Sequence, residues 1–389
     1  MSSPMFATVI GALALLIWLY LLLGRGGFWL ARERDDRGEA PPPAAWPSVT
    51  AVVPARDEAD VIARSVGSLL AQNYPGRFRI ILVDDQSTDG TADAAMLAAR
   101  ALGASARLDV LRGAPLPSGW TGKLWAMSQG VASAGAAEAP DYLWLTDADI
   151  GHAPDGLSRL VSRAEHGGLQ LTALMVKLHC GTWPERMLIP AFVFFFQMLF
   201  PFAWVNDAKN RLAAGAGGCM LVRREALERA GGIASVRTEI IDDCALARKL
   251  KAQGPIWLGL ATRAVSLRPY VSIDQIGRMI SRSAYAQLGY SPWLLGGTLL
   301  GMALTYLAPP LLALFGHGLA RGAGAAAWLL MTISFQPMLR LYRRSPLWGL
   351  ALPAIGALYS LFTLQSALEV WRGKGGMWKG RAQALAGRA

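Results

Sequence analysis

Short apolar runs alternate with segments of helical periodicity between residues 48 and 146. The predicted strands cover residues 49–53, 78–83, 108–112 and 142–146, and the predicted helices cover 58–72, 91–102 and 124–134. Strands that alternate with helices in this way predict an α/β fold with a parallel sheet. Ligands of such sheets bind beyond the carboxyl ends of the strands, so the residues that follow each run are the first candidates for a functional site.

Pairs of carboxylates follow two of these strands. The first strand-end pair is Asp84 and Asp85, followed by a turn-forming "STDG", and the second is Asp147-Ala-Asp149 after "YLWLT". Taken alone, the first pair fits an Asx-type turn before a helix equally well. A DxD triplet directly after a second such strand indicates instead that carboxylates converge on one hard cation. Mg²⁺ or Mn²⁺ held in this way usually also takes oxygens from a substrate diphosphate.

Three further polar positions have both a structural and a functional interpretation. Asp242 and Asp243 lie in the first turn of a predicted helix. In the structural interpretation their charges complement the helix dipole, and in the functional interpretation one of them is a base that deprotonates a hydroxyl. Gln275 and Arg278 share one face of a predicted amphipathic helix. In the structural interpretation this helix lies on a membrane surface, and in the functional interpretation Arg278 also reaches a diphosphate or the acceptor. Lys123 is either a solvated lysine before a helix or a cation that neutralises a phosphate.

The two ends of the chain are more apolar than its middle. Hydrophobic residues make up 53% of the chain and charged residues 17%, a balance that leans toward membrane proteins. Residues 5–23 carry no charge and are about as long as a bilayer-spanning helix. No basic segment precedes them and no cleavage site follows, so a retained anchor is favoured over a signal peptide. The arginines from Arg25 to Arg37 hold the following residues in the cytoplasm by the positive-inside rule.

Three more membrane spans are predicted near the C-terminus, at roughly 294–316, 324–340 and 347–368. Four spans in total put Arg340, Arg343 and Arg344 inside, as the positive-inside rule requires, but they put the basic tail outside. One C-terminal segment is therefore re-entrant or interfacial in the alternative arrangement, and the number of spans stays open. The apolar run 187–204 is predicted to lie in the plane of the interface, because a crossing would separate the two halves of one site.

Charge, cysteine content and missing motifs argue against several classes of protein. The net charge is +11, but no nucleic-acid-binding motif accompanies it, so no nucleic-acid partner is expected. Arginines that flank membrane segments and face anionic lipid explain the excess. The three cysteines form no CxxC pair and the four histidines lack metal-ligand spacing, as in a reduced, cytoplasmic domain. No GxGxxG follows the first strand, which argues against a dehydrogenase.

Taken together, the motifs resemble the family 2 glycosyltransferases with a GT-A fold. They occur in the family's order over about residues 48–290: "VVPARDEAD", "LVDDQSTDG", "GK", "TDAD", "GGCMLVRREAL", "IDDCAL" and "QIGRM". The flanking apolar segments are similar to those of lipid-directed members, including ceramide glucosyltransferase-like enzymes. "GAPLPSGWTGKLWAM", "IPAFVFFFQMLFPFAWVND" and "GPIWLGL" look closest to the bacterial hopene-associated glycosyltransferases of hopanoid biosynthesis.

The resemblance implies a donor site for a UDP-sugar. Pro54, Arg56 and Glu58 would line the nucleotide pocket, with Asp84 and Asp85 near the uracil and the ribose. Lys123 and the Asp147–Asp149 pair would face the diphosphate, with Asp149 as the direct ligand of Mg²⁺ or Mn²⁺.

The resemblance also implies the acceptor side. Asp243 matches the family's general base, and Asp242 stands where the family usually has Glu, so which of the two acts stays open. Gln275 and Arg278 match the first and fourth positions of the QxxRW motif, in which Met279 replaces the usual Trp.

The expected fold is therefore α/β, a GT-A domain with a Rossmann-like mixed sheet and with N- and C-terminal transmembrane helices. The expected segments are an anchor (1–24), a Pro-rich linker (25–47), the GT-A domain (48–270), an interfacial helix (271–291), a transmembrane region (292–370) and a basic tail (371–389). The expected function is inverting transfer of a sugar from a UDP-sugar to a lipid acceptor in hopanoid biosynthesis, at the bacterial inner membrane with the catalytic domain in the cytoplasm. A processive polysaccharide synthase and a non-catalytic membrane scaffold are the alternatives.

Overall fold

The protein forms two compact units in the computed structural model, which describes residues 3–137, 139–373, 377–378 and 381–382. The sheet unit comprises Glu33–His179, Trp204–Arg268 and Gly376–Ala389, and the helical unit comprises Met1–Arg32, Cys180–Ala203 and Pro269–Gly375. Each unit is therefore assembled from segments that are far apart in the sequence.

The sheet unit is built on a mixed β-sheet in the order β3-β2-β1-β4-β7-β6-β8-β5. Its strands are β1 (Val49–Ala55), β2 (Phe78–Asp84), β3 (Leu108–Arg112), β4 (Tyr142–Thr146), β5 (Ile150–His152), β6 (Leu171–Lys177), β7 (Cys219–Arg223) and β8 (Ile256–Ser266). The four predicted strands form the parallel half, β3-β2-β1-β4. Strand β7 runs antiparallel to both β4 and β6, and β5 runs antiparallel to β8.

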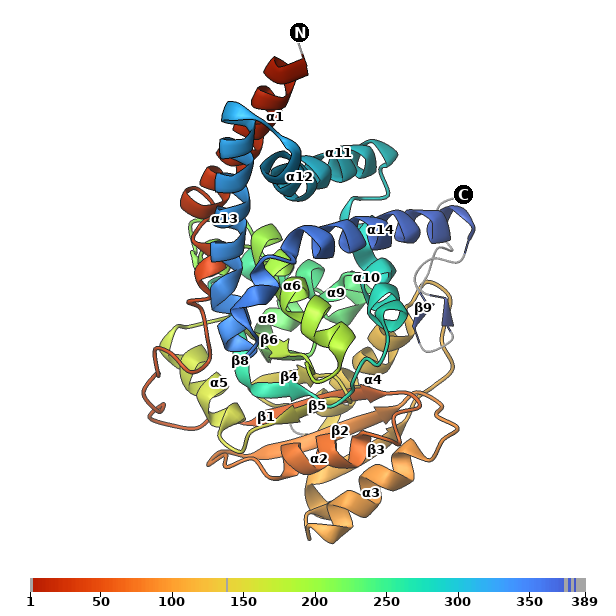
Figure 1. Cartoon of the computed structure of the whole chain (residues 1–389). Helices are drawn as coiled ribbons and strands as arrows, with labels where there is room; N and C mark the ends of the chain where they lie inside the picture. Colours follow the sequence, from red (N-terminus) through yellow and green to blue (C-terminus); the bar gives the residue numbers. More distant parts are fainter. Residues whose placement is uncertain (1–2, 138, 374–376, 379–380, 383–389) are drawn as a thin grey trace. The chain divides into compact units, whose positions relative to one another are not determined.

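Helices cover both faces of the parallel half (Figure 1). The helices of this unit are α2 (Ile62–Leu70), α3 (Thr91–Ala101), α4 (Gly122–Ala137), α5 (Gly156–His166), α8 (Arg224–Arg229) and α9 (Asp242–Lys251), and α7 is Phe202–Asn206. Alternate side chains of β1, such as Ala51 and Val53, enter the core beneath α2. The side chain of Val52 meets α4, where a Cβ on Gly130 would lie only 2.5 Å from Val52 Cγ1. Glycine at this position therefore lets α4 approach the sheet closely.

The strand register brings the candidate site residues to one edge of the sheet. Ala55 at the end of β1 pairs with Asp84 at the end of β2. The end of β4 at Thr146 pairs with Cys219 at the start of β7. Strand β8 runs parallel to β6, which runs in the same direction as β4, so its carboxyl end lies at this edge too. The carboxyl ends of β1, β2, β4 and β8 together form the carboxyl edge.

The segment predicted as a free Pro-rich linker is docked on the sheet unit. Arg34 forms a parallel β-bridge with Leu260. The Asp35 carboxylate accepts hydrogen bonds from the backbone N–H groups of Thr262 and Arg263. Since these contacts satisfy backbone donors of β8, the sheet unit begins at Glu33 and not at residue 48.

The helical unit contains the apolar segments from both ends of the chain. Its helices are α1 (Ser3–Leu23), α6 (Trp183–Leu199), α10 (Ile273–Gln287), α11 (Pro292–Met302), a π-helical stretch (Ala303–Leu307), α12 (Ala308–Phe315), α13 (Gly318–Leu341) and α14 (Leu352–Trp371). Helix α13 packs against α1 and α12, and α10 packs against α14 (Figure 1). Aromatic rings join several of these helices, as in the edge-to-face contact between Trp18 and Tyr306.

The structure supports two of the four predicted membrane spans among the residues it describes. Pro4–Leu23 and Pro292–Phe315 are long and apolar enough to cross a bilayer. Helices α13 and α14 have sufficient length but lower hydropathy, so the predicted spans at 324–340 and 347–368 are not supported. Both helices bury small and polar side chains against their neighbours, for example Ser334 and Ser366, and such residues lower the hydropathy of a core helix.

One other membrane prediction also changes. Helix α6, expected to lie in the interface, is a core helix of the helical unit, because Leu188, Ile189 and Phe194 are all buried. In the basic tail, Met377–Trp378 and Arg381–Ala382 form a short antiparallel pair, β9 and β10, and Lys374 and Lys379 lie outside the described residues.

Candidate active site

The loops that follow β1 and β2 are joined by hydrogen bonds at the carboxyl edge. Arg56 Nη1 donates to the carbonyl oxygen of Asp85 at 2.6 Å and lies 4.0 Å from its carboxylate. The Asp85 side chain is fully buried. The carboxylate of Asp84 turns back to accept from the backbone N–H of Ser87 at 3.0 Å. Asp84 therefore shapes the turn, as the structural interpretation of this pair predicted, and Asp85 with Arg56 forms the buried charged wall.

Glu58 connects the same loops to the rest of the edge. Its backbone N–H donates to Thr91 Oγ1 at 2.8 Å, and its side chain is about one-tenth exposed. Pro54 lies within β1, one strand position before Ala55. Pro54, Arg56, Glu58 and Asp85 thus come together at the end of the first two strands.

The DxD carboxylates lie between β4 and β5, at the adjacent strand end. Lys123 at the start of α4 places its Nζ 2.6 Å from Asp147 Oδ1. Burial is the main cause that raises the pKa of the Asp149 carboxyl to about 6. The negative charges of Asp147 and Glu58 act in the same direction, while nearby cations oppose them. Several carboxylates are therefore held close enough for their charges to repel.

Asp243 approaches this group from the start of α9. Its Oδ2 accepts a hydrogen bond from the backbone N–H of Gly217 at 2.9 Å, and its Oδ1 accepts from that of Cys244 at 2.7 Å. A Cβ on Gly217 would lie 3.3 Å from Lys123 Nζ and 3.6 Å from Asp243 Oδ2, so Lys123 and Asp243 flank the same glycine. Burial and the charge of Asp242 raise the pKa of Asp243 to about 6, against the two hydrogen bonds.

The donor set suits a hard divalent cation. Asp147 and Asp149 offer carboxylate oxygens, which Mg²⁺ and Mn²⁺ prefer. The raised pKa of Asp149 reflects an accumulation of negative charge that a divalent cation would relieve. No group of three or more His, Cys, Asp or Glu side chains able to hold a metal occurs among the described residues. Mg²⁺ held by one or two carboxylates commonly also takes water and substrate phosphate oxygens as ligands.

Arg268 is a charged residue of this edge that the sequence reasoning missed. It lies two residues beyond β8, and its guanidinium pairs with the carboxylate of Glu58 and approaches Asp60 at 3.2 Å. Its Nε lies 3.7 Å from Asp149 Oδ2. Its position just after a strand could have identified it as a candidate site residue, as the same position identified Asp84 and Asp147.

Gln275 and Arg278 belong to the helical unit, on α10. Both are exposed; Gln275 Oε1 accepts from the N–H of Val271 at 2.9 Å, and Arg278 pairs with Asp274. The apolar face of α10 is buried against α14, where a Cβ on Gly277 would lie 2.7 Å from the Phe362 ring. The helix is amphipathic as predicted, but its apolar face packs on protein.

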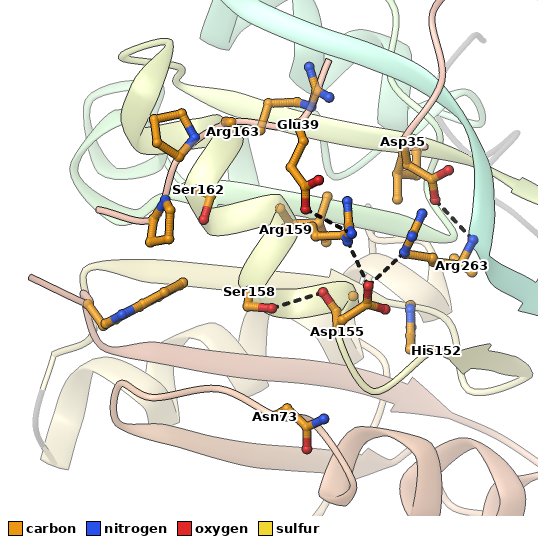
Figure 2. Close-up of a pocket in the computed structure, with 18 of the residues that line it drawn as sticks. Asp35, Glu39, Asn73, His152, Asp155, Ser158, Arg159, Ser162, Arg163 and Arg263 are labelled. Atoms are coloured by element: carbon orange, nitrogen blue, oxygen red, sulfur yellow. Dashed lines mark hydrogen bonds and ion pairs between the residues drawn. The ribbon is translucent and has the colours of Figure 1, made fainter. Parts of the chain in front are cut away.

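A cavity of about 690 Å³ lies elsewhere in the sheet unit, between the docked linker and α5 (Figure 2). Two of its arginines form ion pairs: Arg159 with Glu39 at 2.8 Å and with Asp155 at 2.6 Å, and Arg263 with Asp155 at 2.9 Å. None of the candidate site residues lines it. These ion pairs tie the linker to α5 and β8, and the cavity is not part of the candidate active site.

Comparisons with known proteins agree with this arrangement. Residues 50–231 match the family described as "Glycosyl transferase family 2". A mannosyltransferase from Pyrobaculum calidifontis, solved in complex with GDP-Man and Mn²⁺, is 19% identical, with a TM-score of 0.55 over 94% of this chain and 99% of that chain. At this identity the likeness concerns the fold alone. Curated proteins give no match.

Two further solved structures are similar at lower scores. Mannosyl-3-phosphoglycerate synthase from Rubrobacter xylanophilus is 19% identical, with a TM-score of 0.41 over 67% of this chain and 83% of that chain. S. aureus TarS 1–349 in complex with UDP is 14% identical, with a TM-score of 0.39 over 88% of this chain and 95% of that chain. Residues 50–231 accordingly match a family 2 glycosyltransferase domain, and the chain has an α/β fold of the GT-A type.

Proposed function

We propose that the protein transfers a sugar from a UDP-sugar to a hydroxyl group of a lipid, with inversion at the anomeric carbon. The observation that carries this proposal is the position of Lys123. It pairs with Asp147 of the DxD and lies beside Asp243 at Gly217. Groups suited to a departing diphosphate and to an attacking hydroxyl therefore surround one point at the carboxyl edge.

The chain's own residues supply the proton transfer. Asp243 is the general base: it takes the proton of the acceptor hydroxyl as that oxygen forms its bond to the anomeric carbon. The bond from the anomeric carbon to the diphosphate breaks on the opposite face, and UDP leaves with the electron pair. The raised pKa of Asp243 makes it a stronger base than an ordinary carboxylate. Burial, together with the charge of Asp242, keeps that pKa high, which favours Asp243 over Asp242 as the acting residue.

The remaining groups bind the donor and stabilise the charge that develops on it. Arg56, Glu58 and Asp85 form the wall that would hold the nucleoside, with Asp84 shaping the turn behind them. Lys123 would hold the diphosphate. Asp149, with Asp147, would hold the divalent cation, which when bound neutralises the leaving diphosphate.

The exposed surface of the helical unit is the reason for proposing a lipid as the acceptor. Large apolar side chains are exposed along its two span-length helices, including Leu16 (61% exposed), Trp293 (90%) and Leu300 (73%). Exposed apolar surface of this extent suits a lipid environment. Gln275 and Arg278 on α10 would bind the polar end of the acceptor or the diphosphate. The resemblance to hopene-associated enzymes points to a hopanoid, at the inner membrane with the sheet unit in the cytoplasm.

The proposal is tested by transfer assays on the purified full chain in lipid nanodiscs. UDP-sugars and GDP-Man are offered with hopanoid or ceramide acceptors, and the anomeric configuration of the product is read by NMR. Asp243→Asn should reduce transfer by about 10²–10⁴-fold while leaving UDP binding intact. The matched control is Asp93→Asn, which removes an exposed acid in the first turn of α3 and should leave transfer unchanged.

Three results would contradict the proposal. Near-normal turnover of Asp243→Asn would remove this residue from the mechanism. A product with retained configuration would exclude the single displacement. Transfer only to soluble acceptors would exclude the lipid as substrate.

A further inference from the structure

The guanidinium of Arg268 connects the nucleotide wall to the DxD. It pairs with Glu58 and approaches Asp60 at 3.2 Å, while its Nε faces Asp149 Oδ2 at 3.7 Å. The Arg268 side chain is 30% exposed and that of Glu58 is 10% exposed, so the pair is shielded from water. A guanidinium presents several N–H donors in a rigid fork, which allows it to contact three carboxylates from one position.

Both carboxylates of the DxD therefore face a cation of the protein itself. Lys123 lies at 2.6 Å from Asp147 Oδ1, and Arg268 lies beside Asp149 Oδ2. The proposed function gives Lys123 the diphosphate as a partner but gives Arg268 no role. Arg268 stands next to the oxygen that a divalent cation on Asp149 would use, and two cations cannot both occupy that position without strong repulsion.

A diphosphate would give Arg268 another partner. Guanidinium groups bind phosphate oxygens in a bidentate manner at least as well as carboxylates. Backbone geometry keeps Arg268 at the carboxyl edge during such an exchange, because the N–H of Leu267 donates to the carbonyl oxygen of Asp149 at 2.8 Å. A rearrangement of the side chain alone would carry the guanidinium from Asp149 to the donor.

We propose that Arg268 is a positioning residue that competes with the divalent cation for Asp149 and moves to the diphosphate when the donor binds. Free cation then binds weakly, and the donor and the cation bind together. This inference rests on the cation site of the proposed function. It adds to it a coupling between the two ligands that a purely structural Arg268 would not produce.

The test measures Mn²⁺ binding to the full chain by electron paramagnetic resonance, with and without UDP, and needs no turnover. In the wild type, UDP should raise the affinity for Mn²⁺. In Arg268→Gln, Mn²⁺ alone should bind about five-fold more tightly or better, and the gain produced by UDP should shrink by a similar factor. Arg268→Lys retains the charge but not the fork, so its affinity for Mn²⁺ alone should lie between those of the wild type and Arg268→Gln.

The matched control is Arg64→Gln. Arg64 on α2 donates to the carbonyl oxygen of Leu267 at 3.3 Å, so its loss removes one positive charge nearby without touching Asp149. Equal Mn²⁺ affinities in Arg64→Gln and Arg268→Gln, or an unchanged effect of UDP in Arg268→Gln, would overturn the proposal. If Arg268→Gln does not fold, wild-type affinity and coupling in Arg268→Lys would overturn it in the same way.

Asp149→Asn separates this inference from the proposed function. The variant should lose Mn²⁺ binding. If it binds Mn²⁺ as the wild type does, the cation site itself is wrong and the role of Arg268 falls with it. If Asp149→Asn loses Mn²⁺ while Arg268→Gln behaves like Arg64→Gln, the cation site stands and only the role of Arg268 is overturned.

Discussion

The two units treat charged and apolar side chains in opposite ways. At the carboxyl edge of the sheet unit, Asp85 and Glu58 are both buried, although water would solvate both charges better. In the helical unit, Leu16 and Trp293 are 61% and 90% exposed, although water solvates neither. The sheet unit compensates its buried carboxylates with arginines, Arg56 beside Asp85 and Arg268 beside Glu58, whereas large apolar side chains of the helical unit stay exposed.

Glu185 shows that burial of a carboxylate does not by itself mark a functional site. It is fully buried in the helical unit, at the start of α6. Its two oxygens accept hydrogen bonds from the backbone N–H groups of Gly181, Thr182 and Tyr270. Asp149 instead combines burial, the main cause of its raised pKa, with nearby carboxylates that raise the pKa further. Like-charged neighbours in addition to burial distinguish this site carboxylate from a structural one.

The largest expected effect is on membrane binding, from the same substitution made in each unit. Leu16 on α1 and Leu97 on α3 are almost equally exposed, at 61% and 62%. Leu16→Lys should disfavour insertion of α1 into the bilayer by about 3 kcal/mol, because it puts a charge near the centre of the candidate span. Leu97→Lys should have no such effect. Resistance of the membrane-bound protein to alkaline carbonate extraction measures the difference. Equal extraction of both variants would contradict the prediction that α1 and α3 face different environments.

The next effect concerns packing, which we expect to be tight in both units despite their different surfaces. Gly130→Ala would place a Cβ 2.5 Å from Val52 Cγ1 and should destabilise the fold by about 1–3 kcal/mol. Gly277→Ala, which meets the Phe362 ring at 2.7 Å, should be destabilising in the same range.

Gly135→Ala on the same α4 helix is the control for Gly130→Ala. Nothing lies within 4 Å of its added Cβ, so it should stabilise the helix by up to about 1 kcal/mol. Urea unfolding in detergent, followed by circular dichroism, measures these differences. Similar stabilities for Gly130→Ala and Gly135→Ala would show that α4 does not pack closely on β1.

The smallest effect is the pH dependence of transfer at saturating donor and cation. Asp243 must be ionised to accept a proton, and its pKa is raised to about 6. The rate should therefore fall as the pH decreases through 6, to about one-tenth of its plateau at pH 5. An ordinary carboxyl would still be mostly ionised there. A rate that stays level down to pH 5 would show that Asp243 is not the titrating base.

Much of the sheet unit could be predicted because its local patterns are strong. The run 142–146 was predicted as a strand and β4 has the same bounds, and the predicted helix 91–102 differs from α3 by one residue. The carboxylates after β2 and β4 met at one edge because parallel strands end on the same side. The match to family 2 confirms the general assignment.

The helical unit was harder to predict, because the hydropathy of a segment does not distinguish burial in protein from burial in lipid. Helix α6 was expected at an interface and is buried in protein, and two of the four expected spans are not supported. The docked linker was missed for a related reason. Its proline content predicted stiffness, but the hydrogen bonds of Asp35 to β8 depend on a strand more than 200 residues away.

Local sequence was enough to predict the four strands of the parallel half, most helices and the carboxylates at the strand ends, because each depends on residues that are neighbours in the chain. The tertiary structure alone decided which strands run antiparallel, that Lys123 lies between Asp147 and Asp243, and that Arg268 reaches Glu58 and Asp149. Those arrangements join charges from distant segments. Their interaction depends on separation in space, which periodicity along the chain does not encode.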